Sequence, residues 1–339
     1  MSSREPLAVR ADAPAALDVP PAHLELTWRA LQVRDAEALH ELAEVVAQHD
    51  AAHERVSPDE VLEMVTVPGI DLTKDSLGGF DDRGRLRAYA LVEVRPGAGT
   101  VRAVLRGSVH PTWRGRGIGR AVLAWMEGRG RQKLAEIEGD LPGRLAVMVD
   151  EAARDQRRLY AAAGFSPIRW YTTMRRDLAT PLPEARVPDG LRVVGWEEAR
   201  SEAVRLAHNE TFGDHWGSEP LTSEAWEHHD AHFAPAWSFV AVTDAGEVAG
   251  YVVSGRYPQD WPVLGYSCGF TDVLGVRRPW RGRGLGTALL VAAMTAYRAD
   301  GMDNANLRVD TANPTGAVGL YERLGYVPEH GYVMYSVEI

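Results

Sequence analysis

The sequence has little of several features that assign a chain to a class. It contains one cysteine, Cys268, in 339 residues, so an internal disulfide is excluded and a reducing compartment suits the chain. No uninterrupted apolar run approaches the ~20 residues of a membrane-spanning helix. Positive charge is in deficit, with a formal net charge of −10, which argues against a nucleic-acid-binding surface. We predict a cytoplasmic protein with no membrane and no nucleic-acid partner.

The first residues lack the apolar core of a secretory signal and carry acids and prolines instead. They are rich in alanine and proline, and we expect a flexible leader over residues 1–22. The single cysteine has no sequence motif around it. We interpret it as a small buried residue rather than as a nucleophile.

One loop sequence occurs twice in the chain. VHPTWRGRGIGRAVL runs from Val109 to Leu123, and VRRPWRGRGLGTALL runs from Val276 to Leu290. A glycine-containing turn precedes each copy, and a Leu-Tyr-x-x-x-Gly-aromatic segment follows each. The repeated unit is far longer than a solenoid repeat, and each half is long enough to bury a core. We predict two similar domains, 23–178 and 191–339, joined by a proline-containing linker at 179–190.

Strand and helix patterns alternate within each half, which is typical of an α/β fold with a mixed sheet. Each glycine loop lies between an apolar strand and a helix. The later short helix of each half ends at a glycine, Gly164 or Gly325.

The glycine loop has the chemistry of an anion site. Glycine permits positive φ and close approach of a ligand to the backbone, and the following helix N-terminus offers unpaired N–H groups to a phosphate or pyrophosphate. A P-loop needs Lys-Ser/Thr after the last glycine, but Thr287 and Ala288 follow Gly286 here. The loop also lies too late in its domain for a dinucleotide-binding G-x-G-x-x-G turn. For one copy alone, a tight strand-to-helix turn is the plain alternative.

The second half continues with RVDTANPTGAVGLYERLGYVP from Arg308 onward. An R-x-x-G-x-G loop followed by N-x-x-x-A-x-x-L-Y-x-x-x-G-Y resembles the GCN5-related N-acetyltransferases, the GNAT superfamily. The likeness covers both halves, and the tandem arrangement resembles that of the mycothiol synthases. It implies two GNAT-like domains, each with a mixed, mainly antiparallel sheet flanked by helices.

The resemblance also implies roles for individual residues. The loops would bind the pyrophosphate of acetyl-CoA, and the strand before the second loop would part from its neighbour and hold the pantetheine arm. Tyr321 matches the tyrosine that protonates the departing thiolate. The implied cofactor-binding residues are Leu274, Gly275, Val276, Arg281, Gly282, Arg283, Gly284, Leu285, Gly286, Thr287 and Asn313 in the second half, and Val109, Arg114, Gly115, Arg116, Gly117, Ile118, Gly119 and Arg120 in the first.

The two halves differ where the chemistry requires a base. An amine must lose a proton to attack a thioester, and Asp272, on the strand entering the second loop, is the predicted base; an ordinary surface aspartate is the alternative. In the first half Leu105 stands at that position and Ala152 stands opposite Asn313, although Tyr160 matches Tyr321. We therefore predict a catalytically degenerate N-terminal domain that still fits the cofactor, and a catalytic C-terminal domain.

By the same resemblance, the acceptor pocket is expected between the first strand of the second half and its glycine turn. Phe212, Asp214, His215 and Trp216 are the predicted lining, with ordinary packing as the alternative. No H-E-x-x-H or comparable spacing is present, so no metal site is predicted.

The combined interpretation is an acetyl-CoA-dependent N-acetyltransferase that acts on a primary amine of a small molecule by direct attack. A different acyl-CoA, a protein lysine acceptor and a non-catalytic CoA-binding regulatory protein are the alternatives. The likeness to mycothiol synthases implies a cysteinyl amine, and aminoglycosides, amino acids and polyamines stay open. A monomer and a homodimer are both compatible with the sequence.

Overall fold

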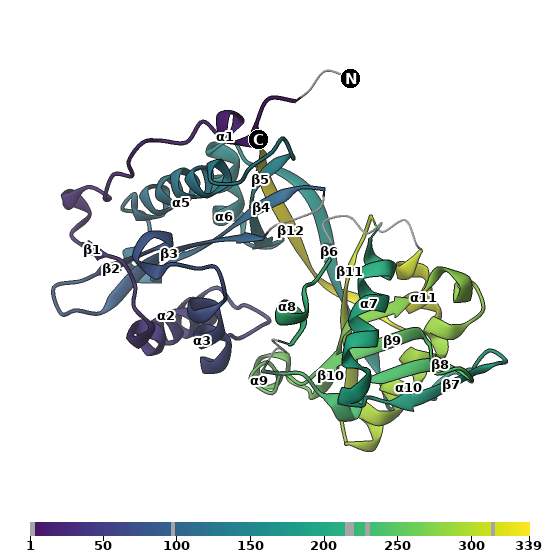
Figure 1. Cartoon of the computed structure of the whole chain (residues 1–339). Helices are drawn as coiled ribbons and strands as arrows, with labels where there is room; N and C mark the ends of the chain where they lie inside the picture. The colour runs from purple at the N-terminus through teal and green to yellow at the C-terminus, as the bar shows by residue number, and fades with distance from the viewer. Residues whose placement is uncertain (1–3, 96–98, 214–219, 228–230, 313–315) are drawn as a thin grey trace. The chain divides into compact units, whose positions relative to one another are not determined.

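The computed structural model describes residues 4–95, 99–213, 220–227, 231–312 and 316–339. The chain divides into two compact units (Figure 1). Unit 1 holds the chain up to Ile168 together with Val333–Ile339, and unit 2 holds Arg169–Tyr332. None of the helices in the described ranges is long and apolar enough to cross a membrane.

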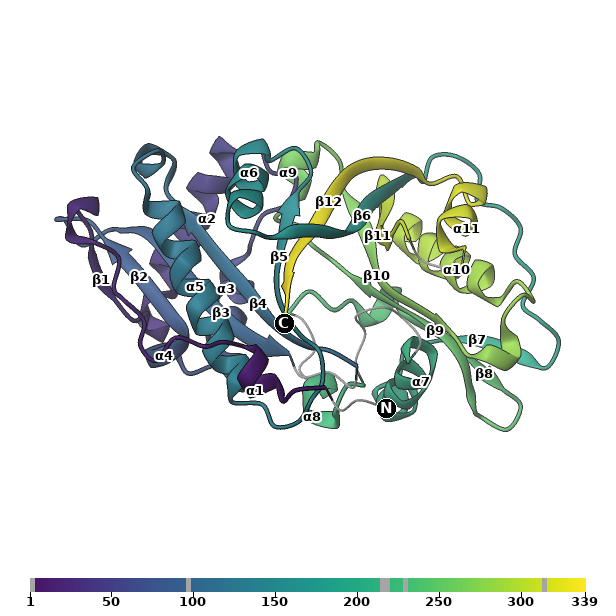
Figure 2. The ribbon, with the colours of Figure 1, turned by 90° about the horizontal axis from the view of Figure 1, so that it is seen from above.

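Unit 1 is built on a sheet with the strand order β1-β2-β3-β4-β5. β4 and β5 are parallel, and the other described pairs are antiparallel. α5 packs on β3 and β4, while α2 and α3 cover the other face with a separate apolar cluster (Figure 2). The strands are β1 (Thr27–Arg29), β2 (Ser76–Phe80), β3 (Leu86–Arg95), β4 (Val101–Val109) and β5 (Gly143–Asp150). The helices are α1 (Leu7–Arg10), α2 (Ala36–His49), α3 (Pro58–Thr66), α4 (Leu72–Asp75), α5 (Ile118–Ala135) and α6 (Arg154–Ala162).

Unit 2 repeats this plan with the order β6-β11-β10-β9-β8-β7. Only β10 and β11 are parallel among its described pairs. α10 covers one face of the sheet and α7 covers β9 and β10 from the other (Figure 2). The strands are β6 (Ser166–Asp177), β7 (Leu191–Gly195), β8 (Phe239–Thr243), β9 (Val248–Gly255), β10 (Cys268–Val276), β11 (Asn304–Asp310) and β12 (Val327–Glu338). The helices are α7 (Ser201–Phe212), α8 (Ser223–Glu227), α9 (Trp261–Leu264), α10 (Leu285–Ala299) and α11 (Ala317–Arg323).

The α/β prediction with mixed sheets is thus confirmed, but the unit boundaries differ from the expected ones. β12 begins in unit 2, and its end belongs to unit 1. There Ile339 exchanges two backbone hydrogen bonds with Gly143 (2.8 and 3.2 Å). The C-terminal residues therefore complete the first unit of the chain, because β5 needs a partner on its outer edge.

The leader and the linker also differ from expectation. Leu7 and Ala11 have no exposed surface and belong to the core of unit 1, so this part of the segment expected to be flexible is packed. The expected linker has no helix or strand, as its prolines predict. Its Leu182 and Val187 nevertheless pack on the core of unit 2. Apolar side chains in both segments explain why they attach to the units.

Candidate active site

In both units the glycine loop turns a strand into a helix through two left-handed glycines. Their φ angles are 73° and 84° at Gly282 and Gly284, and 78° and 92° at Gly115 and Gly117. Gly284 is the N-cap of α10 and Gly117 that of α5, and neither helix start has a side-chain cap. A Cβ at Gly282, Gly284 or Gly115 would meet no atom within 4 Å. The loops therefore leave open space before an uncapped helix N-terminus, which is the geometry of an anion site.

The first arginine of each loop clamps the end of the preceding strand. Arg281 Nε donates to the carbonyl of Val276 at 2.9 Å, and Arg114 Nε donates to the carbonyl of Val109 at 3.1 Å. These guanidinium groups thus fix the shape of the loop from within. Their identical use in the two units explains why the arginine occurs in both copies of the motif.

The same arginines tie each loop to the C-terminal end of the first long helix of its unit. Arg281 Nη2 donates to the carbonyl of Thr211 in α7 at 3.2 Å. In unit 1, Arg114 makes a bidentate contact at 2.6 and 2.8 Å with Asp50, the residue that ends α2. Unit 1 therefore neutralises its loop arginine with a carboxylate, whereas unit 2 uses only a peptide dipole for this contact.

The strand before each loop parts from its parallel neighbour. β10 pairs with β11 only from Cys268 to Thr271, although β10 continues to Val276. β4 likewise pairs with β5 only from Val101 to Val104. Past these points the strand keeps its antiparallel partner but loses its parallel one. The parting expected before the second loop is present. Among the described residues it leaves a strand edge without a parallel partner, and such an edge suits an extended ligand.

Asp272 lies at the point where β10 leaves β11. The register between β9 and β10 shifts between Thr271 and Val273, so Asp272 is the extra residue of a β-bulge. Its side chain is exposed, and Oδ1 accepts a hydrogen bond from Tyr257 Oη at 3.0 Å. In unit 1 the β3–β4 register is uniform, and Leu105 is 4% exposed within the core. The bulge thus turns an acidic side chain outward in unit 2 only.

Tyr321 lies on α11, which packs beside the start of α10. A Cβ at Gly286 in the first turn of α10 would lie 3.6 Å from Leu320 Cδ2. The ring of Tyr321 is buried, and burial raises its pKa to about 12. Within the described ranges the Tyr321 hydroxyl makes no hydrogen bond. The phenol therefore stays protonated at neutral pH and can donate a proton.

Unit 1 keeps the corresponding tyrosine and also has a cavity of about 450 Å³ at its loop. Burial raises the pKa of Tyr160 to about 12, and the nearby Tyr89 adds to the shift. The cavity runs from the glycine loop across the start of α5 to α6. Its lining includes Gly115, Gly117, Gly119, Arg120, Leu159 and Tyr160.

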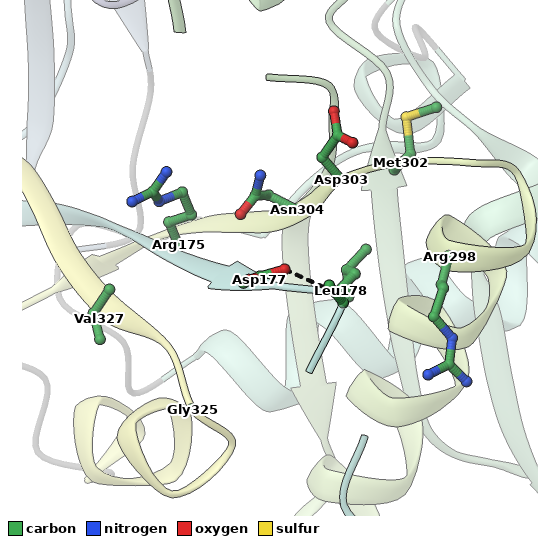
Figure 3. Close-up of a pocket in the computed structure, with 10 residues that line it drawn as sticks. Arg175, Asp177, Leu178, Arg298, Met302, Asp303, Asn304, Gly325 and Val327 are labelled. Atoms are coloured by element: carbon green, nitrogen blue, oxygen red, sulfur yellow. Dashed lines mark hydrogen bonds between the residues drawn. The ribbon is translucent and has the colours of Figure 1, made fainter. Parts of the chain in front are cut away.

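A second cavity, of about 680 Å³, lies in unit 2 where β11 starts, at the end opposite to the parting of the strands (Figure 3). Two of its polar side chains make contacts within the protein. Arg175 pairs with Glu329 at 3.4 Å, and Asp177 Oδ1 accepts from the backbone N–H of Ala179 at 2.8 Å. This cavity therefore lies apart from the glycine loop and from Asp272.

The remaining predicted residues have different outcomes. Phe212 ends α7, and its ring stacks on His208 with centroids 4.5 Å apart. The following residues lie outside the described ranges: Asn313, Asp214, His215 and Trp216.

Burial raises the pKa of the Cys268 thiol to about 12, which fits the interpretation of a buried residue without a nucleophilic role. Among the described residues no group of three or more His, Cys, Asp or Glu side chains could hold a metal ion.

Two features were missed in the sequence. The clamp by Arg114 and Arg281 has a signal, because both copies place an arginine five residues after the last valine of the strand. The contact between Tyr257 and Asp272 has none, since it depends on a bulge that no residue pattern marks.

Comparison with known proteins identifies the family. Residues 201–326 match the model of the Acetyltransferase (GNAT) family. A mycothiol acetyltransferase from Thermobispora bispora is 36% identical over 235 residues, which is 67% of this chain and 73% of that protein. The crystal structure of a GCN5-related N-acetyltransferase from Sphaerobacter thermophilus superposes with a TM-score of 0.72 at 26% identity, covering 94% of this chain and 97% of that one. A tandem GNAT protein from the clavulanic acid biosynthesis pathway shares the fold, with a TM-score of 0.65 at 22% identity over 93% and 98% of the two chains. The chain therefore belongs to the GNAT acetyltransferase family, in its tandem two-domain form.

Proposed function

We propose that this enzyme transfers the acetyl group of acetyl-CoA to a primary amine of a small molecule, and that unit 2 performs the transfer. One observation carries the proposal. In unit 2, the loop, the free strand edge and the outward carboxylate of Asp272 occur together on one strand-loop-helix segment. Unit 1 has the loop and the strand edge, but no acid at the corresponding place.

The residues of unit 2 fit acetyl-CoA. The uncapped start of α10, with open space at Gly282 and Gly284, suits a pyrophosphate. The free edge of β10 from Asp272 to Val276 suits the amide groups of a pantetheine arm. Acetyl-CoA would supply an acetyl group activated as a thioester.

Two side chains divide the proton transfers. Asp272 accepts the proton that the attacking amine must lose, because a carboxylate exposed at the parting of the strands can meet a ligand. Tyr321 donates its phenolic proton to the sulfur that leaves, since its raised pKa keeps that proton in place at neutral pH. General acid help of this kind is worth ~10²–10⁴ in rate.

Unit 1 is proposed to bind the cofactor without transferring the acetyl group. The cavity of about 450 Å³ between its loop and Tyr160 supports binding. The buried Leu105 in place of Asp272 supports the loss of turnover. A structural or regulatory contribution of a bound CoA is the function that this arrangement favours for unit 1.

The acceptor is proposed from the relatives. They bear the name mycothiol acetyltransferase, and a cysteinyl amine is therefore the first acceptor to test. Another acyl-CoA donor and a protein lysine acceptor are the competing choices within the same chemistry.

The test is calorimetric titration with acetyl-CoA, paired with CoA release in the presence of a cysteinyl amine. Gly284→Glu and Gly117→Glu each place an anion where a pyrophosphate would lie. Gly284→Asn and Gly117→Asn are the controls, because asparagine tolerates positive φ and adds no charge. We expect Gly284→Glu to abolish turnover, and Gly117→Glu to remove a binding event while turnover persists. Absence of any acetyl-CoA binding by the wild type contradicts the proposal.

A further inference from the structure

The carboxylate of Asp272 is held by a phenol from outside its own strand. Tyr257 follows the end of β9 by two residues, and its Oη donates to Asp272 Oδ1 at 3.0 Å. Tyr257 is half-buried, and its ring packs edge-on against Phe270 with centroids 5.6 Å apart. The phenol thus has a fixed position from which to orient the carboxylate.

A glycine makes this contact possible. Gly255 is the last residue of β9 and pairs with Phe270, two residues before Asp272. A Cβ at Gly255 would lie 2.5 Å from Cε2 of Tyr257 and 2.6 Å from Asp272 Oδ2. Both distances are shorter than carbon contacts allow, so any side chain at residue 255 would displace the phenol, the carboxylate or both. The bulge, the glycine and the phenol act together on one carboxylate.

A polar chain continues behind the phenol. The ring of His232 lies 4.8 Å from that of Tyr257, and Gln259 Nε2 lies 3.2 Å from His232 Nε2. On the helix side of the sheet, burial raises the pKa of the Tyr297 phenol, and the nearby charge of Asp272 adds to the shift. The titratable groups near Asp272 thus include Tyr257, His232 and Tyr297.

Unit 1 differs at the position that corresponds to Gly255. Glu93 lies 162 residues before Gly255 (255 − 93), the spacing that also relates Tyr89 to Tyr251. Its carboxylate pairs with Arg95 at 2.8 Å and with Arg106 at 2.6 Å. An ion-pair cluster in unit 1 thus occupies the place that unit 2 keeps for a carboxylate and its phenol.

We propose that Tyr257 is a positioning residue for Asp272, holding Oδ1 so that Oδ2 receives the proton of the acceptor amine. This inference rests on the proposed function, in which Asp272 is the base. The proton passes from the amine nitrogen to Oδ2, and the phenol keeps its own proton throughout. Gly255 is the second requirement, because it leaves room for both groups.

The test compares Tyr257→Phe with the wild type in CoA release with a cysteinyl amine. We expect kcat/KM for the amine to fall about ten- to a hundredfold, the range of a hydrogen bond to a charged group. Affinity for acetyl-CoA stays unchanged. The acidic limb of the pH profile moves to higher pH, because loss of a donor to the charged form raises the pKa of a carboxylate. Tyr266→Phe is the matched control, since Tyr266 donates to Glu329 at 2.7 Å, away from Asp272.

A double-mutant cycle separates positioning from other roles. With Asp272→Asn already present, Tyr257→Phe should cause no further loss. An equal loss in both backgrounds, or no loss in either, overturns the positioning role. Gly255→Ala is a second test, because the added Cβ would displace the phenol, the carboxylate or both. We expect the acidic limb of its pH profile to move to higher pH, as in Tyr257→Phe. A fully active Asp272→Asn enzyme instead overturns the assignment of the base, and absence of turnover in the wild type overturns the proposed function itself.

Discussion

Unit 1 and unit 2 share a left-handed glycine pair, an arginine clamp on the preceding strand and a buried tyrosine with a raised pKa. One difference between them is a shift of one residue in strand register. β9 and β10 are offset by the bulge at Asp272, whereas β3 and β4 pair without interruption through Leu105. The features proposed for cofactor binding reside mostly in backbone conformation, and both units have them. The feature proposed for proton transfer resides in one side chain and one bulge, and unit 2 alone of the two has it.

The comparison also shows which residues unit 1 has in place of the exposed carboxylate of Asp272. Without an outward carboxylate, unit 1 points Leu105 into its core and forms the Glu93 cluster on the strand beside it. Both choices stabilise the sheet, since a leucine adds buried apolar surface and a paired carboxylate is satisfied. Under the proposed function, unit 1 performs no transfer, so its residues at this position can favour stability where unit 2 has an exposed acid.

The largest expected effect is a loss of kcat that distinguishes Tyr321 from Tyr160. Tyr321→Phe should lower kcat ~10²–10⁴-fold if the phenol donates its proton to the leaving sulfur, while Tyr160→Phe should leave kcat unchanged. Both rings are 8% exposed, so similar shifts in melting temperature serve as the internal control. Because the pKa of Tyr321 is raised to about 12, the acid form persists through neutral and moderately alkaline pH. A decrease of kcat that begins below pH 10 would therefore not come from Tyr321, and it should persist in Tyr321→Phe. Equal losses of kcat in the two variants would contradict the proposed difference between Tyr321 and Tyr160.

A second prediction tests whether an acid alone restores unit 1. Leu105→Asp in the Asp272→Asn background should give no turnover, because no bulge turns residue 105 outward. The substitution buries a carboxylate in the core and should destabilise unit 1 by about 3–5 kcal/mol. Thermal unfolding should show a loss of roughly 10 °C for a unit of this size. Turnover by this variant would show that the bulge is dispensable.

Much of this arrangement could be predicted from the sequence, because it depends on glycine and on repetition. The two loops and their helices follow from residue types at fixed spacing, whereas the parting of the strand and the match of Tyr321 follow from the resemblance to the GNAT superfamily. The bulge at Asp272 could not be predicted, because register depends on pairing with another strand. The same reason hides the contact with Tyr257, which two strands and a glycine bring together.

The unit boundaries differ from the expected ones for a related reason. Composition placed the boundary at a proline-containing segment, but the C-terminal strand belongs to unit 1 through its pairing with Gly143. A long-range pair of this kind leaves no local signal. The leader was expected to be flexible from its prolines and alanines, yet Leu7 and Ala11 are buried in the core of unit 1.

A third prediction concerns the arginine clamps. Arg281→Lys keeps the positive charge but loses the planar fork that reaches the carbonyls of Val276 and Thr211 together. We expect acetyl-CoA affinity in unit 2 to fall about five- to tenfold by calorimetry. Arg114→Lys should instead lower the stability of unit 1 by ~1 kcal/mol or less, since its ion pair with Asp50 is partly exposed. Unchanged affinity in Arg281→Lys would show that charge alone matters at this position.

The smallest expected effect concerns the second arginine of each loop. Arg283 lies over Trp280 with 5.1 Å to the ring centroid, and Arg116 lies over Trp113 at 4.5 Å. Arg116 also pairs with the exposed Glu25 at 3.5 Å, whereas no ion pair of Arg283 occurs among the residues that the structure describes. A cofactor phosphate would therefore meet an undiminished charge only in unit 2.

Arg283→Ala should weaken acetyl-CoA binding about two- to fivefold at low salt, the range of an exposed charge contact. Arg116→Ala should weaken binding less, because Glu25 already offsets its charge. Glu25→Gln is the matched control, and it should strengthen binding in unit 1 slightly. Raising the salt concentration should erase all three differences, since these charges are solvent-exposed. A salt-independent effect would mean that Arg283 acts through its packing on Trp280, and the contrast between the loops would then be one of shape rather than charge.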